Sequence, residues 1–258
     1  MTMDSTDSIF GPAVAVDGAP LGASIILVCE HASYHIPDAF HGMGLPADLL
    51  QSHVAWDPGA LALARDLAER LEAPLVHGQI SRLLHDCNRP PEAPDAIVAQ
   101  GEWDPVPGNL NLSDQDRQQR VDHVYRPFHD RLRREIAARK VALELLVTVH
   151  TFTPVYRGDE RQVQLGILHG HDPRFARMMF DRKPGNVTED TRLNEPYSAA
   201  DGVTHTLDLQ GTGNGLLTVM LEVRSDLLRT PDAQRDWGAR LAPWILETLA
   251  AIRSGARA

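Results

Sequence analysis

The stretch S-I-I-L-V-C-E-H, at residues 24–31, decides the class of fold. Its first six residues form a short apolar run rich in β-branched and aliphatic side chains, which predicts a strand buried on both faces. Comparable apolar runs occur at residues 144–150, 163–168 and 216–223, with shorter ones at 74–77 and 81–84. We expect these segments to be the strands of a sheet.

Helical patterns alternate with these strands. Apolar residues recur at helical spacing over 58–72, where Asp57 and Pro58 have the form of an N-cap and a first-turn proline. Ser113 has the form of a cap for a second helix, and Pro127 falls inside that helix and predicts a kink. This second helix is expected over 114–140, and further helices are expected over 173–182 and 231–253. The alternation predicts an α/β fold with a mixed, mostly parallel sheet covered on both faces.

The chain shows no internal repeat, low-complexity tract or linker, so residues 23–258 are expected to form a single domain. Residues 1–22 are polar and contain several glycines and prolines, which predicts an irregular N-terminal segment. Residues 86–112 and 184–202 are also polar and rich in loop-forming residues. We expect these two segments to be long loops that shape a binding pocket.

Composition excludes several classes of function. The net charge of the 258-residue chain is -10, whereas nucleic-acid and anionic-membrane surfaces need clustered Lys and Arg. The two cysteines, Cys29 and Cys87, are too few for a disulfide framework or a thiolate zinc site. No apolar run is long enough to cross a membrane, and no signal peptide is visible. We therefore expect a cytoplasmic protein that binds a small molecule, as a monomer or a homo-oligomer.

Ionisable residues follow three of the predicted strands. Glu30 and His31 end one strand, His150 ends another, and Glu222 and Arg224 end a third. Ligands bind at the carboxyl ends of strands in open α/β sheets, so these side chains are expected to converge. Two imidazoles with one or two carboxylates are the ligands of a catalytic zinc site, and a carboxylate that stays off the metal can act as a general base.

Several of these residues also have a simpler structural explanation. A histidine that follows a strand is more often a hydrogen-bonded loop residue than a metal ligand. Asp57 has the form of a helix N-cap, a role that needs no metal, and Glu222 could pair with an arginine. Arg82 and Arg89 could lie at the surface.

Six motifs, taken together, carry a resemblance to a known family. They are V-C-E-H-A-S-Y-H-I-P at 28–37, S-H-V-A-W-D-P-G-A at 52–60, S-R-L-L-H-D-C-N-R-P at 81–90, V-H-T-F-T-P at 149–154, N-E-P-Y-S at 194–198 and L-E-V-R-S-D-L at 221–227. In this order, over about residues 24–228, they resemble the N-formylglutamate amidohydrolase family. That family is related in fold to zinc carboxypeptidases and aspartoacylase. The resemblance therefore implies a three-layer α/β/α sandwich around a central mixed sheet.

The resemblance also implies roles for individual residues. His31 and His150 are similar to the metal ligands of the family, and Glu222 is similar to the carboxylate that activates water. Asn88 and Arg89 resemble a pair that holds a substrate carboxylate, a task that suits a planar guanidinium. Further candidates for substrate binding are Arg82, Arg161 and Arg224.

The chain departs from related enzymes at the third metal ligand. Zinc carboxypeptidases use the pattern His-x-x-Glu, whereas Tyr34 stands third after His31. Asp57 is our first choice, because its motif is similar to the aspartate motif of the family. Glu30 is second, since on a strand-like backbone it would point away from His31, and His53 is third.

The sequence therefore predicts an amidohydrolase that uses Zn2+ or another divalent metal. Its expected substrate is an N-formyl or other N-acyl amino acid, with an acidic one such as N-formyl-L-glutamate favoured. A non-catalytic binding or regulatory protein and a zinc-carboxypeptidase-like peptidase are the alternatives on the same scaffold. A serine hydrolase that uses Ser33 or Ser198 is less favoured, because the chain has no G-x-S-x-G nucleophile elbow.

Overall fold

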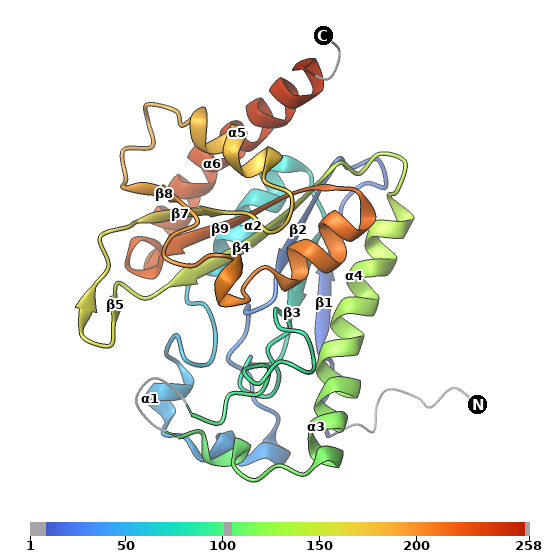
Figure 1. Ribbon diagram of the computed structural model, residues 1–258, viewed down its shortest axis with the longest axis vertical. Coiled ribbons are helices and arrows are strands. Elements are labelled where there is room, and N and C mark those ends of the chain that lie inside the picture. The colour runs from blue at the N-terminus through green and yellow to red at the C-terminus, as the bar shows by residue number, and fades with distance from the viewer. Residues whose placement is uncertain (1–8, 101–104, 256–258) are drawn as a thin grey trace.

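A seven-stranded mixed sheet lies at the centre of the protein (Figure 1). The computed structural model describes residues 9–100 and 105–255. The strands of the sheet are β1 (Val14–Asp17), β2 (Ile25–Cys29), β3 (Leu75–Gly78), β4 (Leu145–Phe152), β7 (Leu165–Leu168), β8 (Thr191–Leu193) and β9 (Leu217–Arg224). They lie in the order β1-β3-β2-β4-β9-β7-β8. Four of them, β3, β2, β4 and β9, run parallel. The predicted α/β class with a mixed, mostly parallel sheet is confirmed.

Helices cover both faces of this sheet (Figure 1). One layer contains α2 (Ala60–Leu71), α5 (Arg174–Asp181) and α6 (Pro231–Gly255), which share one apolar core with the strands. The other layer contains α4 (Arg126–Ala138), preceded by α3 (Asp114–Arg120), and the helical run 205–214. Among the described residues, none of the helices combines the length and the apolar character that a membrane span requires.

Shorter elements complete the chain. They are α1 (Ala47–Leu50), the hairpin of β5 (Val155–Tyr156) and β6 (Asp159–Glu160), and the 3-10 turns Asp38–Gly44, Pro107–Asn109, Ala199–Asp201 and Ser225–Leu228. The β5–β6 hairpin and several of these turns lie in the connections between strands and helices.

The alternation of side chains along β4 decides which of its residues reach the site. Val147 and Val149 belong to the core beneath α2 and α6, whereas Leu146 belongs to the core beneath α4. Successive side chains of a strand point to opposite faces, so His150 shares the face of Leu146. The sheet therefore presents His150 on the side of α4 and the helical run 205–214.

Apart from the unpredicted β5–β6 hairpin, the structure differs from the predicted strands in three places. Residues 14–17, predicted to be irregular, form the edge strand β1, which pairs antiparallel with β3. Residues 191–193, predicted to be loop, form β8. Both strands are short and only half-buried: β1 holds just three consecutive apolar residues, Val14–Val16, and β8 holds one, Leu193. The strand expected at 81–84 is a turn, in which the Leu84 N–H donates to the Ser81 carbonyl at 3.1 Å.

Helix α2 begins at Ala60, and Asp57 does not cap it. The N-cap is Gly59, which has a φ of 86° and has no side chain that could cap the helix. A Cβ at Gly59 would lie 2.8 Å from the Cβ of Leu228, so both the dihedral and the space require glycine. The predicted capping role of Asp57 is therefore wrong, and its carboxylate makes other contacts.

The helix predicted over 114–140 is present in two parts. Its predicted cap is confirmed, because the Ser113 hydroxyl accepts the Asp116 backbone N–H at 3.2 Å and the Asp116 carboxylate accepts the Ser113 N–H at 3.1 Å. A π-helical turn, Val121–Tyr125, then precedes α4, whose first turn holds Pro127. The π-helical turn interrupts the regular hydrogen bonds of the helix just before Pro127. Proline has no N–H to donate, so it is tolerated at this position in the first turn of α4.

Gly78, the last residue of β3, allows close approach to the segment that leads to His31. A Cβ on Gly78 would lie 2.2 Å from the backbone oxygen of Glu30. We expect Gly78→Ala to lower the free energy of unfolding by at least about 1–3 kcal/mol, because the methyl group must displace backbone. Chemical denaturation measures this change. Gly22→Ala is the matched control, since nothing lies within 4 Å of a Cβ there, and equal losses in the two variants would contradict the argument.

Candidate metal centre and pocket

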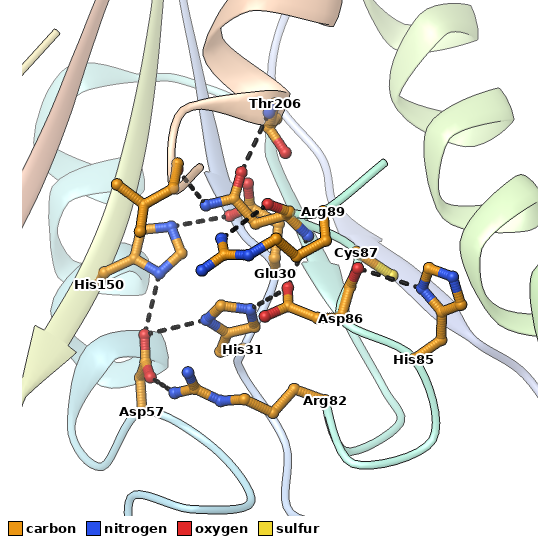
Figure 2. Close-up of polar contacts among 12 residues, drawn as sticks. Glu30, His31, Asp57, Arg82, His85, Asp86, Cys87, Arg89, His150 and Thr206 are labelled. Atoms are coloured by element: carbon orange, nitrogen blue, oxygen red, sulfur yellow. Dashed lines mark hydrogen bonds and ion pairs between the residues drawn. The ribbon is translucent and has the colours of Figure 1, made fainter. Parts of the chain in front are cut away.

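Three buried side chains gather at the carboxyl ends of the central strands. His31, Asp57 and His150 each offer one ligand atom, and these atoms all lie within 4.8 Å of one another. The Asp57 Oδ2 atom lies 2.9 Å from Nδ1 of His150 and 3.4 Å from Nδ1 of His31 (Figure 2). The structure therefore brings together the three residues that the sequence placed in a metal site, and this cluster could hold a metal ion.

Three separate elements position this cluster. His31 lies in the turn after β2, one residue beyond Glu30, and His150 lies within β4. Asp57 lies in the loop before α2, where its backbone N–H donates to the His31 carbonyl at 2.9 Å. The backbone N–H of Thr151 donates to Asp57 Oδ2 at 3.3 Å, and the Arg82 guanidinium donates to Oδ1 of the same carboxylate. These contacts fix Asp57 between the two imidazoles.

Each histidine of the cluster also faces a second carboxylate. Nε2 of His31 lies 2.7 Å from Asp86 Oδ1, and Nε2 of His150 lies 3.2 Å from Glu30 Oε2 (Figure 2). An ionised carboxylate can only accept, so Nε2 of His31 carries the hydrogen and its Nδ1 presents a lone pair. His150 faces carboxylates at both nitrogens, and although burial lowers its pKa, the charge of Glu30 raises it overall. Carboxylates behind metal-binding histidines commonly fix the tautomer and the ring orientation in this way.

The arrangement leaves Asp57 facing the Nδ1 lone pair of His31. Burial, together with the charge of Arg82, lowers the pKa of His31 to about 4, so this imidazole is neutral at neutral pH. Its Nδ1 atom is buried and has no hydrogen-bond partner among the described residues. A neutral imidazole nitrogen beside a carboxylate oxygen needs a cation between them. The donor set therefore fits a divalent metal, and His31, Asp57 and His150 are the residues that would hold it.

Glu30, the second choice for the third ligand, lies on the far side of His150 from Asp57. Its side chain is fully buried, and neither of its oxygens has a geometrically good hydrogen bond among the described residues. Burial alone would raise the pKa of Glu30, but the charge and hydrogen bonding of His150 lower it to about 2. Glu30 and His31 lie in the turn after β2, and their side chains reach different partners, His150 and Asp86. His53, the third choice, lines the pocket described next.

A pocket of about 540 Å³ opens over the cluster. Glu222 lines it and is the register partner of His150 in the parallel pair β4–β9, so the two side chains lie side by side. Burial raises the pKa of Glu222, and its Oε2 atom has no hydrogen-bond partner among the described residues. Of the residues predicted to bind substrate, those that also line the pocket are Arg82, Asn88, Arg89 and Arg161.

Two of the predicted substrate-binding residues are engaged within the protein. Asn88 donates from Nδ2 to the Val203 carbonyl at 2.5 Å and accepts the Thr206 N–H on Oδ1 at 3.0 Å. Arg224 is not among the described residues that line the pocket. Its guanidinium pairs with Asp226 at 2.8 Å and donates to the Arg161 carbonyl at 2.9 Å. Arg224 thus supports the backbone at Arg161.

Several residues of the site were not predicted from the sequence. Asp86, the partner of His31, falls inside the motif at 81–90, but no local pattern links it to a histidine 55 positions away. Tyr156 and Tyr197 line the pocket and flank Arg161. They lie in the hairpin and in a loop, where neither periodicity nor composition indicates which way a side chain points.

Comparisons with known proteins agree with these observations. The family model for N-formylglutamate amidohydrolase matches residues 23–229. Gene product Atu2144 of Agrobacterium tumefaciens, of known crystal structure, is 43% identical, with a TM-score of 0.91 over 95% of this chain and 100% of that chain. No curated protein matches the chain.

A second solved structure is similar in fold alone. An N-formylglutamate amidohydrolase from Ralstonia eutropha JMP134 is 14% identical, with a TM-score of 0.57 over 94% of this chain and 99% of that chain. The resemblance inferred from the six motifs is confirmed by the family match, which spans all of them. The chain belongs to the N-formylglutamate amidohydrolase family of hydrolases.

Proposed function

We propose that the protein is a metal-dependent amidohydrolase that cleaves the amide bond of an N-acyl amino acid, with N-formyl amino acids foremost. N-formyl-L-glutamate is one member of that class. The observation that carries the proposal is the pair of imidazole Nδ1 atoms directed at one Asp57 oxygen, with Glu222 beside them. Two imidazoles and a carboxylate make Zn2+ the first choice of metal.

Different residues of the chain would carry out different parts of the hydrolysis. A divalent ion held by the cluster would polarise the scissile carbonyl and make a neighbouring water more acidic. Glu222 takes a proton from the attacking water on a carboxylate oxygen and delivers it to the nitrogen of the leaving amine. The buried position of Glu222 suits this exchange, since burial brings its pKa closer to neutrality. Arg82 lines the same pocket and donates a hydrogen bond to the Asp57 carboxylate.

Neither serine that was considered as a nucleophile has the contacts of one. The Ser33 hydroxyl accepts the backbone N–H of His35 at 3.0 Å, and the Ser198 hydroxyl donates to Asp201 at 3.1 Å. Among the described residues, neither hydroxyl has a hydrogen bond to a histidine side chain that could take its proton. This geometry favours attack by water over a covalent acyl intermediate.

Replacing Glu222, the proposed base, tests its role in turnover separately from metal binding. We expect Glu222→Gln to lower kcat at least about 100-fold on any N-formyl amino acid that the wild-type enzyme hydrolyses, because the amide cannot take the proton of water. Metal content should stay at the wild-type level. Release of formate and elemental analysis measure the two quantities. Glu247→Gln, at an exposed position of α6, is the control. Wild-type turnover by Glu222→Gln would remove Glu222 from the chemistry.

The two carboxylates behind the histidines allow a test that needs no turnover. We expect Glu30→Gln and Asp86→Asn each to weaken metal affinity about 10- to 100-fold, because an amide holds the imidazole less firmly and withdraws the negative charge. Competition with a chromophoric chelator measures the affinity.

Asp201→Asn is the matched control for these two variants. Asp201 lines the pocket, and its carboxylate accepts hydrogen bonds from the backbone and hydroxyl of Ser198 rather than from either histidine. Equal affinities in all three variants would show that Glu30 and Asp86 do not act through His150 and His31.

A further inference from the structure

Three arginines line the pocket, and two of them are already paired with carboxylates. The Arg82 guanidinium donates to Asp57. Arg89 donates from Nε to Asp95 at 2.7 Å and from Nη1 to the carbonyls of Asn88 and Gly202 at 3.1 and 3.0 Å. Arg82 and Arg89 therefore have most of their charge compensated within the protein.

Arg161 differs from the other two arginines in its surroundings. Among the described residues it forms no ion pair, and its guanidinium carbon lies 5.5, 4.7 and 4.9 Å from the ring centroids of Phe152, Tyr156 and Tyr197. Nη1 of Arg161 donates to the Thr153 carbonyl at 3.4 Å, and the guanidinium also hydrogen-bonds to the uncharged phenol of Tyr197. Rings against the faces of a guanidinium leave its N–H edges available to an anion.

The backbone also holds Arg161 in place. Its N–H donates to the Pro154 carbonyl at 2.8 Å, which closes the base of the β5–β6 hairpin. Its carbonyl accepts a hydrogen bond from Arg224 at 2.9 Å. A cation fixed in this way loses little conformational freedom when it binds a carboxylate, which favours a tight and specific contact.

The other charges of the pocket disfavour a second substrate carboxylate. The pocket is lined by four carboxylates, those of Asp57, Asp86, Asp201 and Glu222, and by three arginines. Together with the proposed divalent ion, the arginines exceed these carboxylates by one positive charge, which matches a single substrate carboxylate. A substrate with two carboxylates would need a second cation without a partner, or its extra charge would lie unpaired in a partly desolvated site. Only Arg161 meets that description among the described pocket arginines.

We propose that this site selects N-acyl amino acids with one carboxylate, the α-carboxylate, which Arg161 binds, and with a neutral side chain. The rings of Tyr156 and Tyr197 offer an apolar wall for that side chain. The inference rests on the proposed amidohydrolase function and names its substrate class. It departs from the acidic substrate expected from the sequence, because Arg89 and Asn88 are engaged within the protein.

The test compares substrates of nearly equal shape and different charge. With the metal-loaded wild-type enzyme, we expect kcat/KM for N-formyl-L-glutamine and N-formyl-L-phenylalanine to exceed that for N-formyl-L-glutamate by at least about tenfold. Glutamate equal to or better than glutamine would overturn the substrate class while leaving the amidohydrolase intact. Hydrolysis of none of the three would overturn the proposed function itself.

Binding gives a second measurement that does not depend on turnover. In Glu222→Gln, calorimetric dissociation constants for the three compounds should follow the same order as the specificity. Tighter binding of N-formyl-L-glutamate than of N-formyl-L-glutamine would contradict the inference, whatever the activity.

Two variants test the roles assigned to the arginines. Arg161→Met should raise KM for the neutral substrates about 10- to 100-fold, because a charged hydrogen-bonding partner of the carboxylate is lost. Arg157→Met is the matched control: Arg157 also lies over the Tyr156 ring, at 5.4 Å, but is not among the described residues that line the pocket. Equal KM values for these two variants would remove Arg161 from carboxylate binding.

Asp95→Asn should change specificity in the opposite direction. Losing this carboxylate frees the Arg89 guanidinium, so kcat/KM for N-formyl-L-glutamate should rise relative to that for N-formyl-L-glutamine by at least about threefold. An unchanged ratio would show that the engagement of Arg89 with Asp95 does not set the preference.

Discussion

The parallel pairing of β4 with β9 is the constraint on which the site depends. Their register joins Leu145 to Leu217 and continues to Phe152 and Arg224, and within it His150 stands opposite Glu222. A slip of one residue would send one of these two side chains to the opposite face of the sheet. The apolar residues of both strands hold the register, because they are buried on both faces. The packing of the hydrophobic core therefore also fixes the position of Glu222, the candidate base.

The neighbouring pair β2–β4 adds the remaining charges. It brings Glu30 and His31 beside His150, and the loop before α2 places Asp57 against both imidazoles. Burying such groups is costly unless each is paired. Here, Nε2 of His31 is paired with Asp86, but its Nδ1 lone pair faces Asp57, and His150 lies between the carboxylates of Asp57 and Glu30. The arrangement is poorly compensated as a purely structural cluster and well suited to a bound cation.

Much of this could be predicted from the sequence. Apolar runs revealed the central strands, and the ionisable residue at the end of each strand indicated where the site lies. The edge strands β1 and β8 were not predicted, because half-buried strands of three or four residues have at most a very short apolar run. Asp57 was predicted both as a cap and as a ligand. A glycine with positive φ caps α2 instead, and that dihedral cannot be seen in a pattern of residue types.

The details of recognition were less accessible than the metal cluster. Motif order indicated Asn88 and Arg89 as a carboxylate clamp, yet the structure engages both with the protein, through partners as distant in sequence as Val203. Arg161 acquires its character from three aromatic rings in different segments. Such contacts arise only when the β5–β6 hairpin and the loop at 194–198 fold over the sheet, so local sequence could not reveal them.

The metal content of the purified protein tests the central claim most directly. We expect the wild-type chain to bind an equimolar amount of a divalent metal, measured by elemental analysis after dialysis. We expect His150→Ala and Asp57→Ala to lose this metal while remaining folded by circular dichroism. A folded His150→Ala or Asp57→Ala variant with the metal content of the wild type would contradict it, because the ion would then lie elsewhere.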